Sequence, residues 1–317
     1  MVIWSRREFL GVMASAGIST LAGPVAWAGG HTTRVGVVGW NAFSRRVARV
    51  FRDIPQLTIA AVADVDPSSS LLSDWRKEFP GYLPRLYRRV PTMLEQCNLD
   101  FVYVHGADDS LDEMPIHVLL EDPDLRCIRS LSSPSMCIQI LPKYEFGGIS
   151  RASSLLSGNW THAMIDCRSA LPATPFHAKS ELASWLCREV GEAVDFVSEL
   201  MDLTQAEQVF AAATPAVSGH QAKFGWRFVC TGSASRTTDL SVVATHSSKT
   251  HTGITITLTG QGQSVVLHAA PRSPRFTRFL ICNLIDTARS RNQQALLYHP
   301  AVLKQSYDLV SRAAMSV

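Results

Sequence analysis

The sequence lacks the patterns that mark metal-binding and disulfide-stabilised proteins. Its seven cysteines contain no Cys-x-x-Cys pair, and its ten histidines contain no His-Glu-x-x-His motif or other paired ligand spacing. The number of cysteines is odd, and most of them lie in apolar runs such as Phe228-Val229-Cys230. We therefore expect buried free thiols and no metal site. Disulfides stay an alternative if the protein works outside the cytoplasm, where the environment is oxidising.

A strong charge of either sign is also missing. The formal net charge is +3, of which Arg6, Arg7 and Glu8 contribute +1, so the chain after residue 28 carries +2. Nucleic-acid binding depends on a concentrated basic surface that neutralises phosphates. The composition therefore gives no reason to expect a nucleic-acid partner.

Long hydrophobic runs are absent after residue 28, so we expect no transmembrane helix there. The chain begins differently: Ser5-Arg6-Arg7-Glu8-Phe9-Leu10 precedes a weakly apolar stretch, Pro24 and then Ala26-Trp27-Ala28. This order resembles a twin-arginine signal with a small-x-small cleavage site. Residues 1–28 are thus expected to engage the twin-arginine export machinery and leave a periplasmic or extracellular protein. Retention as an uncleaved membrane anchor stays open.

The first half after the signal alternates between strand and helix patterns. Short β-branched runs predict strands at 34–39, 57–63, 100–105 and 127–131. Helical spacing predicts helices at 43–51, 68–79, 91–96 and 111–121. This order is typical of an α/β domain with a parallel sheet and helices on both faces.

The second half contains a succession of strands. Predicted strands occupy 163–168, 205–213, 225–231, 239–245, 253–259 and 264–269, and predicted helices occupy 182–201, 275–291 and 300–315. Strands in succession favour a mostly antiparallel sheet in an α+β domain. We place the boundaries at 1–28 for the signal, 32–135 for the first domain and 136–317 for the second.

Several strings in this order resemble the Gfo/Idh/MocA family of glucose–fructose oxidoreductases and inositol dehydrogenases. They are Val35-Gly36-Val37-Val38-Gly39, Ala61-Val62-Ala63-Asp64-Val65-Asp66-Pro67, Leu99-Asp100-Phe101-Val102-Tyr103-Val104 and the closing helices between Phe279 and Ala314. The resemblance implies a Rossmann domain, an NAD(P) cofactor and a sugar-like or cyclitol substrate. It also implies a second domain with an open antiparallel sheet. Because this sheet often forms an oligomer interface in the family, a homo-oligomer is one of the expected states.

The dinucleotide loop is altered from the family pattern Gly-x-Gly-x-x-Gly. The aligned residues are Gly39, Asn41 and Ser44, of which Asn41 would place a side chain near the pyrophosphate. Asp64 ends the second strand, where a carboxylate can accept hydrogen bonds from the ribose hydroxyls and favours NAD over NADP. The alternatives are a plain strand-to-helix turn for the loop and a turn or helix-cap role for Asp64.

The family's catalytic lysine has no counterpart in our alignment. Its Glu-Lys-Pro string after the fifth strand aligns with Ser132-Ser133-Pro134, and Ser133 cannot supply the cation or readily exchange a proton near neutral pH. The segment between residues 134 and 149 is also short, which predicts loss of a sixth strand. Lys143 in this segment is a weaker candidate to replace the lysine.

The second-domain helix departs from the family as well. The family often carries an aspartate, a histidine four residues later and a further aspartate, and the aligned residues here are Arg188, Glu192 and Asp195. Glu192 and Asp195 are the catalytic candidates, with Glu192 as a general base. The structural alternative is a helix-surface ion pair between Arg188 and Glu192.

These departures leave two functions open. A non-catalytic binding or scaffold protein with residual NAD binding explains an altered loop and a missing lysine. An exported NAD(P)-dependent oxidoreductase, or an NAD-dependent glycosidase, explains the fold, Gly39 and Asp64.

Overall fold

The computed structural model describes most of the chain. The described residues are 32–63, 71–79, 83–106, 116–122, 137–146, 159–169, 179–201, 203–214, 222–232, 237–246, 253–290 and 300–315. The predicted signal therefore lies outside them. Among the described residues, no helix combines the length and apolar character that crossing a membrane requires.

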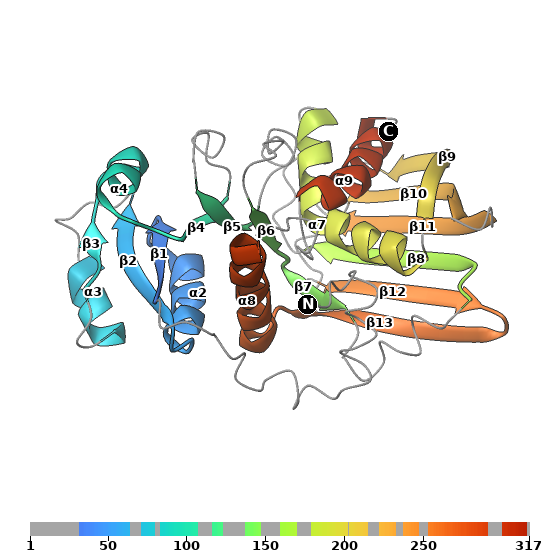
Figure 1. The fold of residues 1–317 in the computed structure, drawn as a ribbon. Helices are drawn as coiled ribbons and strands as arrows, with labels where there is room; N and C mark the ends of the chain where they lie inside the picture. The colour runs from blue at the N-terminus through green and yellow to red at the C-terminus, as the bar shows by residue number, and fades with distance from the viewer. Residues whose placement is uncertain are drawn as a thin grey trace. The chain divides into compact units, whose positions relative to one another are not determined.

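The chain divides into two compact units, each built around one sheet (Figure 1). The first unit contains Pro24–Pro142 and Arg272–Ala301, and the second contains Lys143–Pro271 and Val302–Val317. The sequence predicted one boundary, after residue 135. The structure instead draws a late helical segment into the first unit, so both units are discontinuous in sequence.

The first unit has a parallel sheet, as predicted, and the sheet contains six strands. Its strand order is β3-β2-β1-β4-β5-β6. The strands are β1 (Thr33–Val38), β2 (Leu57–Ala63), β3 (Arg85–Leu86), β4 (Phe101–His105), β5 (His117–Glu121) and β6 (Ile138–Leu141). The helices are α2 (Ala42–Arg52), α3 (Leu71–Glu78), α4 (Val90–Gln96) and α8 (Pro274–Ser290).

The strands form because they are short runs of apolar, largely β-branched residues that are buried on both faces. Val35, Val37 and Val102 are fully buried. Gly36 is required by close packing, since a Cβ there would lie 2.7 Å from Val102 Cγ1 and 2.8 Å from Leu99 Cδ1. Helices α2 and α8 pack against each other, and α8 also contacts β5 and β6.

Two predictions for this sheet were wrong. The helix predicted at 111–121 is contradicted at its end, where His117–Glu121 forms β5 between β4 and β6. Four apolar or β-compatible residues in a row suit either a buried strand or a helix turn, and pairing with two neighbouring strands decided the outcome. The sixth strand, predicted to be lost, is present as β6.

The second unit has a seven-stranded mixed sheet in the order β7-β13-β12-β8-β11-β10-β9. Neighbouring strands are antiparallel except β8 and β11, which agrees with the predicted mostly antiparallel sheet. The strands are β7 (Tyr144–Phe146), β8 (His162–Ser169), β9 (Leu203–Thr214), β10 (Ala222–Gly232), β11 (Thr237–His246), β12 (Gly253–Gly260) and β13 (Gln263–Pro271).

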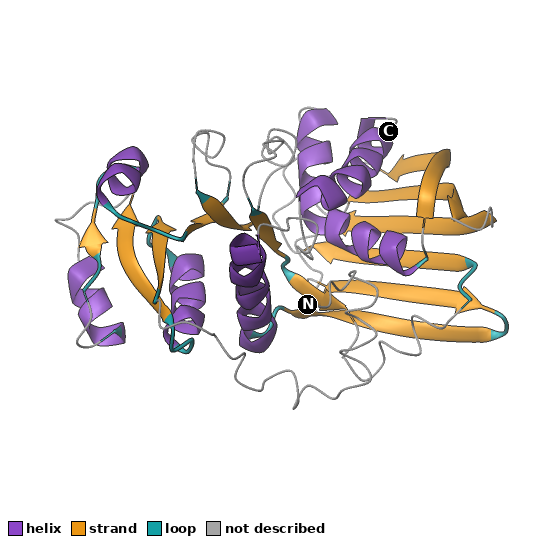
Figure 2. Ribbon diagram, viewed as in Figure 1, coloured by secondary structure: helices purple, strands orange, loops and turns teal. Residues whose placement is uncertain are grey.

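Helices α7 (Lys179–Leu200) and α9 (Pro300–Met315) belong mainly to the second unit (Figure 2). They pack closely where Gly191 faces Tyr307, since a Cβ at Gly191 would lie 2.8 Å from the tyrosine ring. α7 also contacts β7, β8 and β9. Its exposed residues Glu181, Ser184 and Arg188 recur at helical spacing in the first half, while most of the other described side chains of the helix are buried.

Candidate functional site at the carboxyl ends of the parallel strands

Three neighbouring strands of the first unit end on residues with left-handed backbone angles. Gly39 follows β1 with φ 72°, Gly106 follows β4 with φ 86°, and Asp122 follows β5 with φ 54°. Gly39 N–H donates to Ala63 O at 2.9 Å, and Gly106 N–H donates to Glu121 O at 2.8 Å. The sheet order reverses between β1 and β4, and such a switch point is where open α/β sheets bind ligands.

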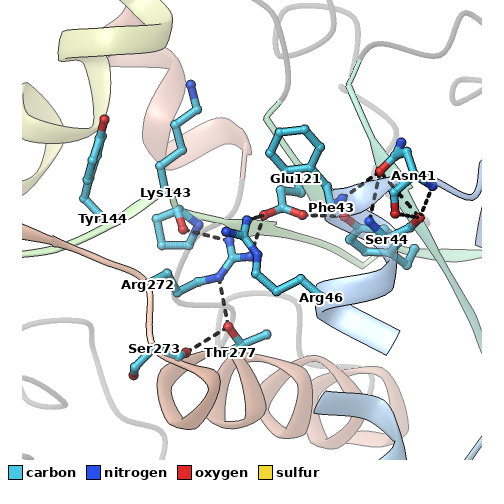
Figure 3. A network of polar contacts seen from close by, with 12 residues as sticks. Asn41, Phe43, Ser44, Arg46, Glu121, Lys143, Tyr144, Arg272, Ser273 and Thr277 are labelled. Carbon is cyan, nitrogen blue, oxygen red and sulfur yellow. Dashed lines mark hydrogen bonds and ion pairs between the residues drawn. The ribbon is translucent and has the colours of Figure 1, made fainter. Parts of the chain in front are cut away.

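The turn between β1 and α2 brings together the predicted residues Gly39, Asn41 and Ser44. Asn41 is the N-cap of α2, and its Oδ1 accepts hydrogen bonds from Phe43 N at 2.9 Å and Ser44 N at 3.0 Å. Ser44 Oγ accepts one in return from Asn41 N at 2.8 Å (Figure 3). Asn41 has φ −129°, so it adopts an extended rather than a left-handed conformation.

This capping box changes what the turn can bind. In a dinucleotide site, free N–H groups at the helix N-terminus hydrogen-bond the pyrophosphate. Here the N–H groups of Phe43 and Ser44 already donate to the Asn41 carboxamide. A phosphate would have to displace this side chain, so the turn as it stands does not fit a pyrophosphate.

Trp40 fills the neighbouring space on the β2 side. Its ring packs on two aromatic residues of and after α3, with centroid separations of 4.5 Å to Trp75 and 6.1 Å to Phe79. The Arg45 guanidinium lies 5.8 Å from the Trp40 ring centroid. Asp64, the predicted ribose ligand at the end of β2, lies outside the described residues.

An aromatic pair lies at the ends of β1 and β4. Phe43, which is 45% exposed, stacks on His105 with a centroid separation of 4.1 Å and an interplanar angle of 18°. His105 Nε2 is buried and has no hydrogen-bond partner among the described residues. This pair was not singled out from the sequence, because the two residues are 62 positions apart and lie on different elements.

The position of β5 corrects the alignment of the lysine motif. Counting along the first unit, the fifth strand is His117–Glu121, and the residues that follow are Asp122 and Pro123. A Glu-Lys-Pro string after the fifth strand, as the resemblance implies, would therefore fall on Glu121-Asp122-Pro123 and not on Ser132-Ser133-Pro134. An aspartate would then occupy the position of the lysine. Ser133 itself lies outside the described residues.

Asp122 carries a positive φ of 54° immediately before a proline. Residues that precede proline normally adopt extended angles, so this backbone is strained. The carboxylate is opposite in charge to the lysine that the family places here. It cannot supply a cation beside a developing alkoxide.

Glu121 was not singled out from the sequence, and in the structure it is a buried, charged residue with a structural role. It is 3% exposed, and its Oε1 accepts from Arg272 Nη2 at 2.5 Å and Arg46 Nη2 at 3.1 Å. Its Oε2 accepts from the Tyr103 hydroxyl. Burial, followed by the adjacent Glu121 carboxylate, raises the pKa of Tyr103 well above its ordinary value of 10.0.

Arg272 completes this network. It donates through Nε to Thr277 Oγ1 at 2.9 Å and through Nη1 to Pro142 O at 2.8 Å. All three guanidinium nitrogens are thus engaged, and the side chain is 4% exposed. Glu121 and Arg272 therefore join β5 to the start of α8 within the first unit, which is a structural use of the glutamate. A glutamate at the end of an apolar run was the one signal in the sequence.

In the second unit, Glu192 anchors the start of β7. Both of its carboxylate oxygens accept from Lys143 N at 2.9 Å, and Oε2 also accepts from Tyr144 N at 3.3 Å. The Glu192 carboxylate therefore holds the backbone at the start of β7 in place. Lys143 directs its ammonium to Arg188 O at 3.4 Å.

The other residues of this helix also make structural contacts. Arg188 pairs with Glu189 at 3.3 Å, so the structure does not show the predicted pairing with Glu192. Arg188 and Glu192 are four residues apart and have the spacing of a helix-surface pair, but Glu192 turns to the backbone at the start of β7. Asp195 is 3% exposed and accepts from Ser306 Oγ of α9 at 3.4 Å.

The described residues contain no group of three or more histidine, cysteine, aspartate or glutamate side chains that could hold a metal ion. Five cysteines are free, and the first four of them are buried: Cys97, Cys137, Cys167, Cys187 and Cys282. The chemistry available at the strand ends is therefore that of aromatic rings, hydrogen-bonded carboxamides and paired charges.

Comparison with known proteins gives a likeness in structure only. No protein-family model matches the chain, and no curated protein matches it in sequence. Among solved structures, a dehydrogenase from Chromobacterium violaceum is 16% identical with a TM-score of 0.68, covering 89% of this chain and 94% of that one. GenD2 from gentamicin A biosynthesis in complex with NAD is 13% identical with a TM-score of 0.66, covering 90% and 95%.

A third solved structure is that of myo-inositol dehydrogenase from Lactobacillus casei in complex with NAD(H) and myo-inositol. It is 12% identical with a TM-score of 0.62, covering 90% of this chain and 94% of that one. Identities this low establish the fold alone. The chain has the two-unit fold of these dehydrogenases, which is the fold that the resemblance to the Gfo/Idh/MocA family implied.

Proposed function

We propose that the chain is an exported, catalytically degenerate relative of the sugar and cyclitol dehydrogenases, which retains their fold as a binding or scaffold protein. NAD binding is at most residual. The observation that carries this proposal is the Asn41 capping box, because it uses the helix N–H groups that a pyrophosphate needs.

The residues aligned with the family's proton-handling positions support the same proposal. Asp122 replaces the lysine, Arg188 replaces the aspartate, and Glu192 replaces the histidine. At the lysine and aspartate positions, the replacing residue has the opposite charge. Glu192 is further committed to the backbone of β7. Asp122 and Arg188 are opposite in charge to the residues that they replace, so neither can perform the original role at neutral pH.

The decisive experiment measures the cofactor content of the protein. The mature protein is purified from cells with intact export and denatured, and the supernatant is assayed for NAD and NADP. We expect less than about one tenth of an equivalent of dinucleotide per chain, because the turn is closed. A stoichiometric dinucleotide would overturn the proposal.

A second candidate is an NAD(P)-dependent oxidoreductase, or an NAD-dependent glycosidase, that acts on a sugar or cyclitol. It is favoured by the solved structures with bound NAD and myo-inositol, and by the left-handed Gly39 that keeps the tight turn of a dinucleotide loop. Under this candidate, Asp64 selects NAD over NADP. The same assay discriminates, because this enzyme must carry or bind its cofactor.

Export by the twin-arginine machinery belongs to both candidates. Its test replaces Arg6 and Arg7 by lysine and follows the protein by cell fractionation, with the wild type as control. Export predicts accumulation inside the cell for the variant and a shortened chain outside the cytoplasm for the wild type. Size-exclusion chromatography of the mature protein tests a homo-oligomer through the sheet of the second unit.

A further inference from the structure

We infer that Asn41 is the residue that keeps pyrophosphate-bearing dinucleotides out of the β1–α2 turn, with its carboxamide oxygen serving as an internal substitute for a phosphate oxygen. This inference rests on the proposed function. It goes further by assigning the exclusion to one side chain that can be removed without rebuilding the site.

The contacts of the carboxamide define the competition. Asn41 Oδ1 lies 2.9 Å from Phe43 N and 3.0 Å from Ser44 N, the two N–H groups at the start of α2 that point away from the helix. A phosphate oxygen bound at this helix end would accept from the same two groups. The side chain and the phosphate are therefore mutually exclusive occupants of these donors.

The rest of the turn retains the features that a dinucleotide loop needs. Gly39 keeps φ 72°, which makes the sharp turn after β1. If a Cβ is built on Gly39, Asn41 Nδ2 lies 3.9 Å from it, and apart from the chain neighbours Val38 and Trp40 no other atom of the described residues lies within 4 Å. Ser44 is small and fully buried, so it allows α2 to pack on the sheet. The Asn41 side chain thus lies beside the turn, on the N–H groups that a phosphate would need.

A second observation concerns Trp40, the residue between Gly39 and Asn41. Its Nε1 is buried and has no hydrogen-bond partner among the described residues. A buried donor without an acceptor is destabilising. An acceptor on a ligand that reached Nε1 would remove that cost.

The experiment compares wild type, Asn41→Gly and Asn41→Asp by isothermal titration calorimetry with NAD. Glycine frees the two N–H groups and lowers helix stability only slightly, so we expect NAD to bind at least about tenfold more tightly than to the wild type. Aspartate is an equally good N-cap and adds a negative charge, so Asn41→Asp should bind no more tightly than the wild type.

The outcomes separate this inference from the proposed function. If the wild type is empty and a folded Asn41→Gly protein shows no gain, the inference is overturned while the proposed function stands. If the wild type carries stoichiometric dinucleotide, the proposed function is overturned, and the inference that rests on it is overturned with it. Should Asn41→Gly not fold, Asn41→Ala removes the same acceptor, and an absence of tighter NAD binding by it overturns the inference equally.

Discussion

The ends of β1 and β5 lie in the same parallel sheet, and each turns through a left-handed residue, yet they are held in different ways. The end of β1 is closed by Asn41 and Ser44, which are three residues apart and uncharged. The end of β5 is held by Glu121 and Arg272, which are 151 residues apart, charged and buried. Local contacts shape one end, and tertiary contacts shape the other.

This difference separates the roles of the two ends. A capping box contributes about 1 kcal/mol and can be removed without loss of the fold. A buried ion pair leaves an uncompensated charge when one partner is removed, at a cost of about 3–5 kcal/mol. Substitutions at the end of β1 therefore change binding with little loss of stability. Substitutions of the charged residues at the end of β5 destabilise the fold.

The largest expected effect on stability comes from removing the ion pair between Glu121 and Arg272 at the end of β5. Arg272→Met leaves the buried Glu121 carboxylate without its closest cation and leaves Pro142 O without a donor. We expect the free energy of unfolding to fall by about 3–5 kcal/mol, measured by urea denaturation of the mature protein.

The matched control is Arg49→Met, which breaks the pair with Glu78 on the surface, where Arg49 is 58% exposed. It should cost less than about 1 kcal/mol. A double variant, Glu121→Leu with Arg272→Met, should recover much of the loss because no charge stays buried. Equal costs for the buried and the exposed pair would remove the distinction between the two strand ends.

A smaller effect is expected from the hydroxyl that completes the β5 end. Tyr103→Phe removes the donor to Glu121 Oε2 and should cost about 1.5–3 kcal/mol at pH 7, since the bond is to a charged group. Burial raises the pKa of Tyr103 in the folded state, so its proton stays on the folded protein and leaves the unfolded chain above pH 10.

The sign of the pH dependence follows from that difference. Above pH 10 the unfolded chain binds fewer protons than the folded one at this site, so stability falls by about 1.4 kcal/mol per pH unit. Tyr103→Phe lacks this contribution. Unfolding curves of both proteins from pH 9 to 11 should therefore converge, and parallel curves would contradict the raised pKa.

A still smaller effect on stability is expected from removing the Asn41 cap at the end of β1. Asn41→Ala removes the acceptor of two helix N–H groups and should lower the free energy of unfolding by about 1 kcal/mol. Asn41→Asp keeps the cap and should change it by only a few tenths of a kcal/mol. Thermal unfolding of the two variants measures this difference. A cost of Asn41→Ala as large as that of Arg272→Met would show that the two ends do not differ.

The contrast between local and tertiary contacts also explains which features the sequence revealed. The residues Gly39, Asn41 and Ser44 were singled out because they align with a six-residue pattern, for which a plain strand-to-helix turn was the alternative. The strands of the second unit were predicted because their alternation repeats over many residues. Both signals are contained in a short window of sequence.

The β5 end gave no comparable signal. His117-Val118-Leu119-Leu120-Glu121 is too short for periodicity to separate strand from helix, and that error moved the lysine motif to Ser132-Ser133-Pro134. The partner of Glu121, Arg272, follows the last strand of the other unit. No window of sequence contains both residues, so only the fold could bring them together.

The smallest expected effect lies at the opposite end of the same strand, where His117 begins β5. Its Nδ1 accepts a hydrogen bond from Cys137 N at 3.1 Å, a contact that only the ring without a proton on Nδ1 can make. Burial lowers the pKa of His117 from its ordinary value of 6.5, while Asp100 opposes the shift. As the pH falls below 6.5, the unfolded chain therefore takes up a proton that the folded protein does not.

Stability should accordingly decrease below pH 6.5 and level off once the folded state also binds the proton, with a slope of less than about 1.4 kcal/mol per pH unit. His117→Asn keeps an acceptor but does not titrate, so its unfolding free energy should fall less between pH 6.5 and 5 than that of the wild type. Urea denaturation at the two pH values gives the comparison. If the variant loses as much stability as the wild type, the acid response belongs to other groups, and β5 is held by its carboxyl end alone.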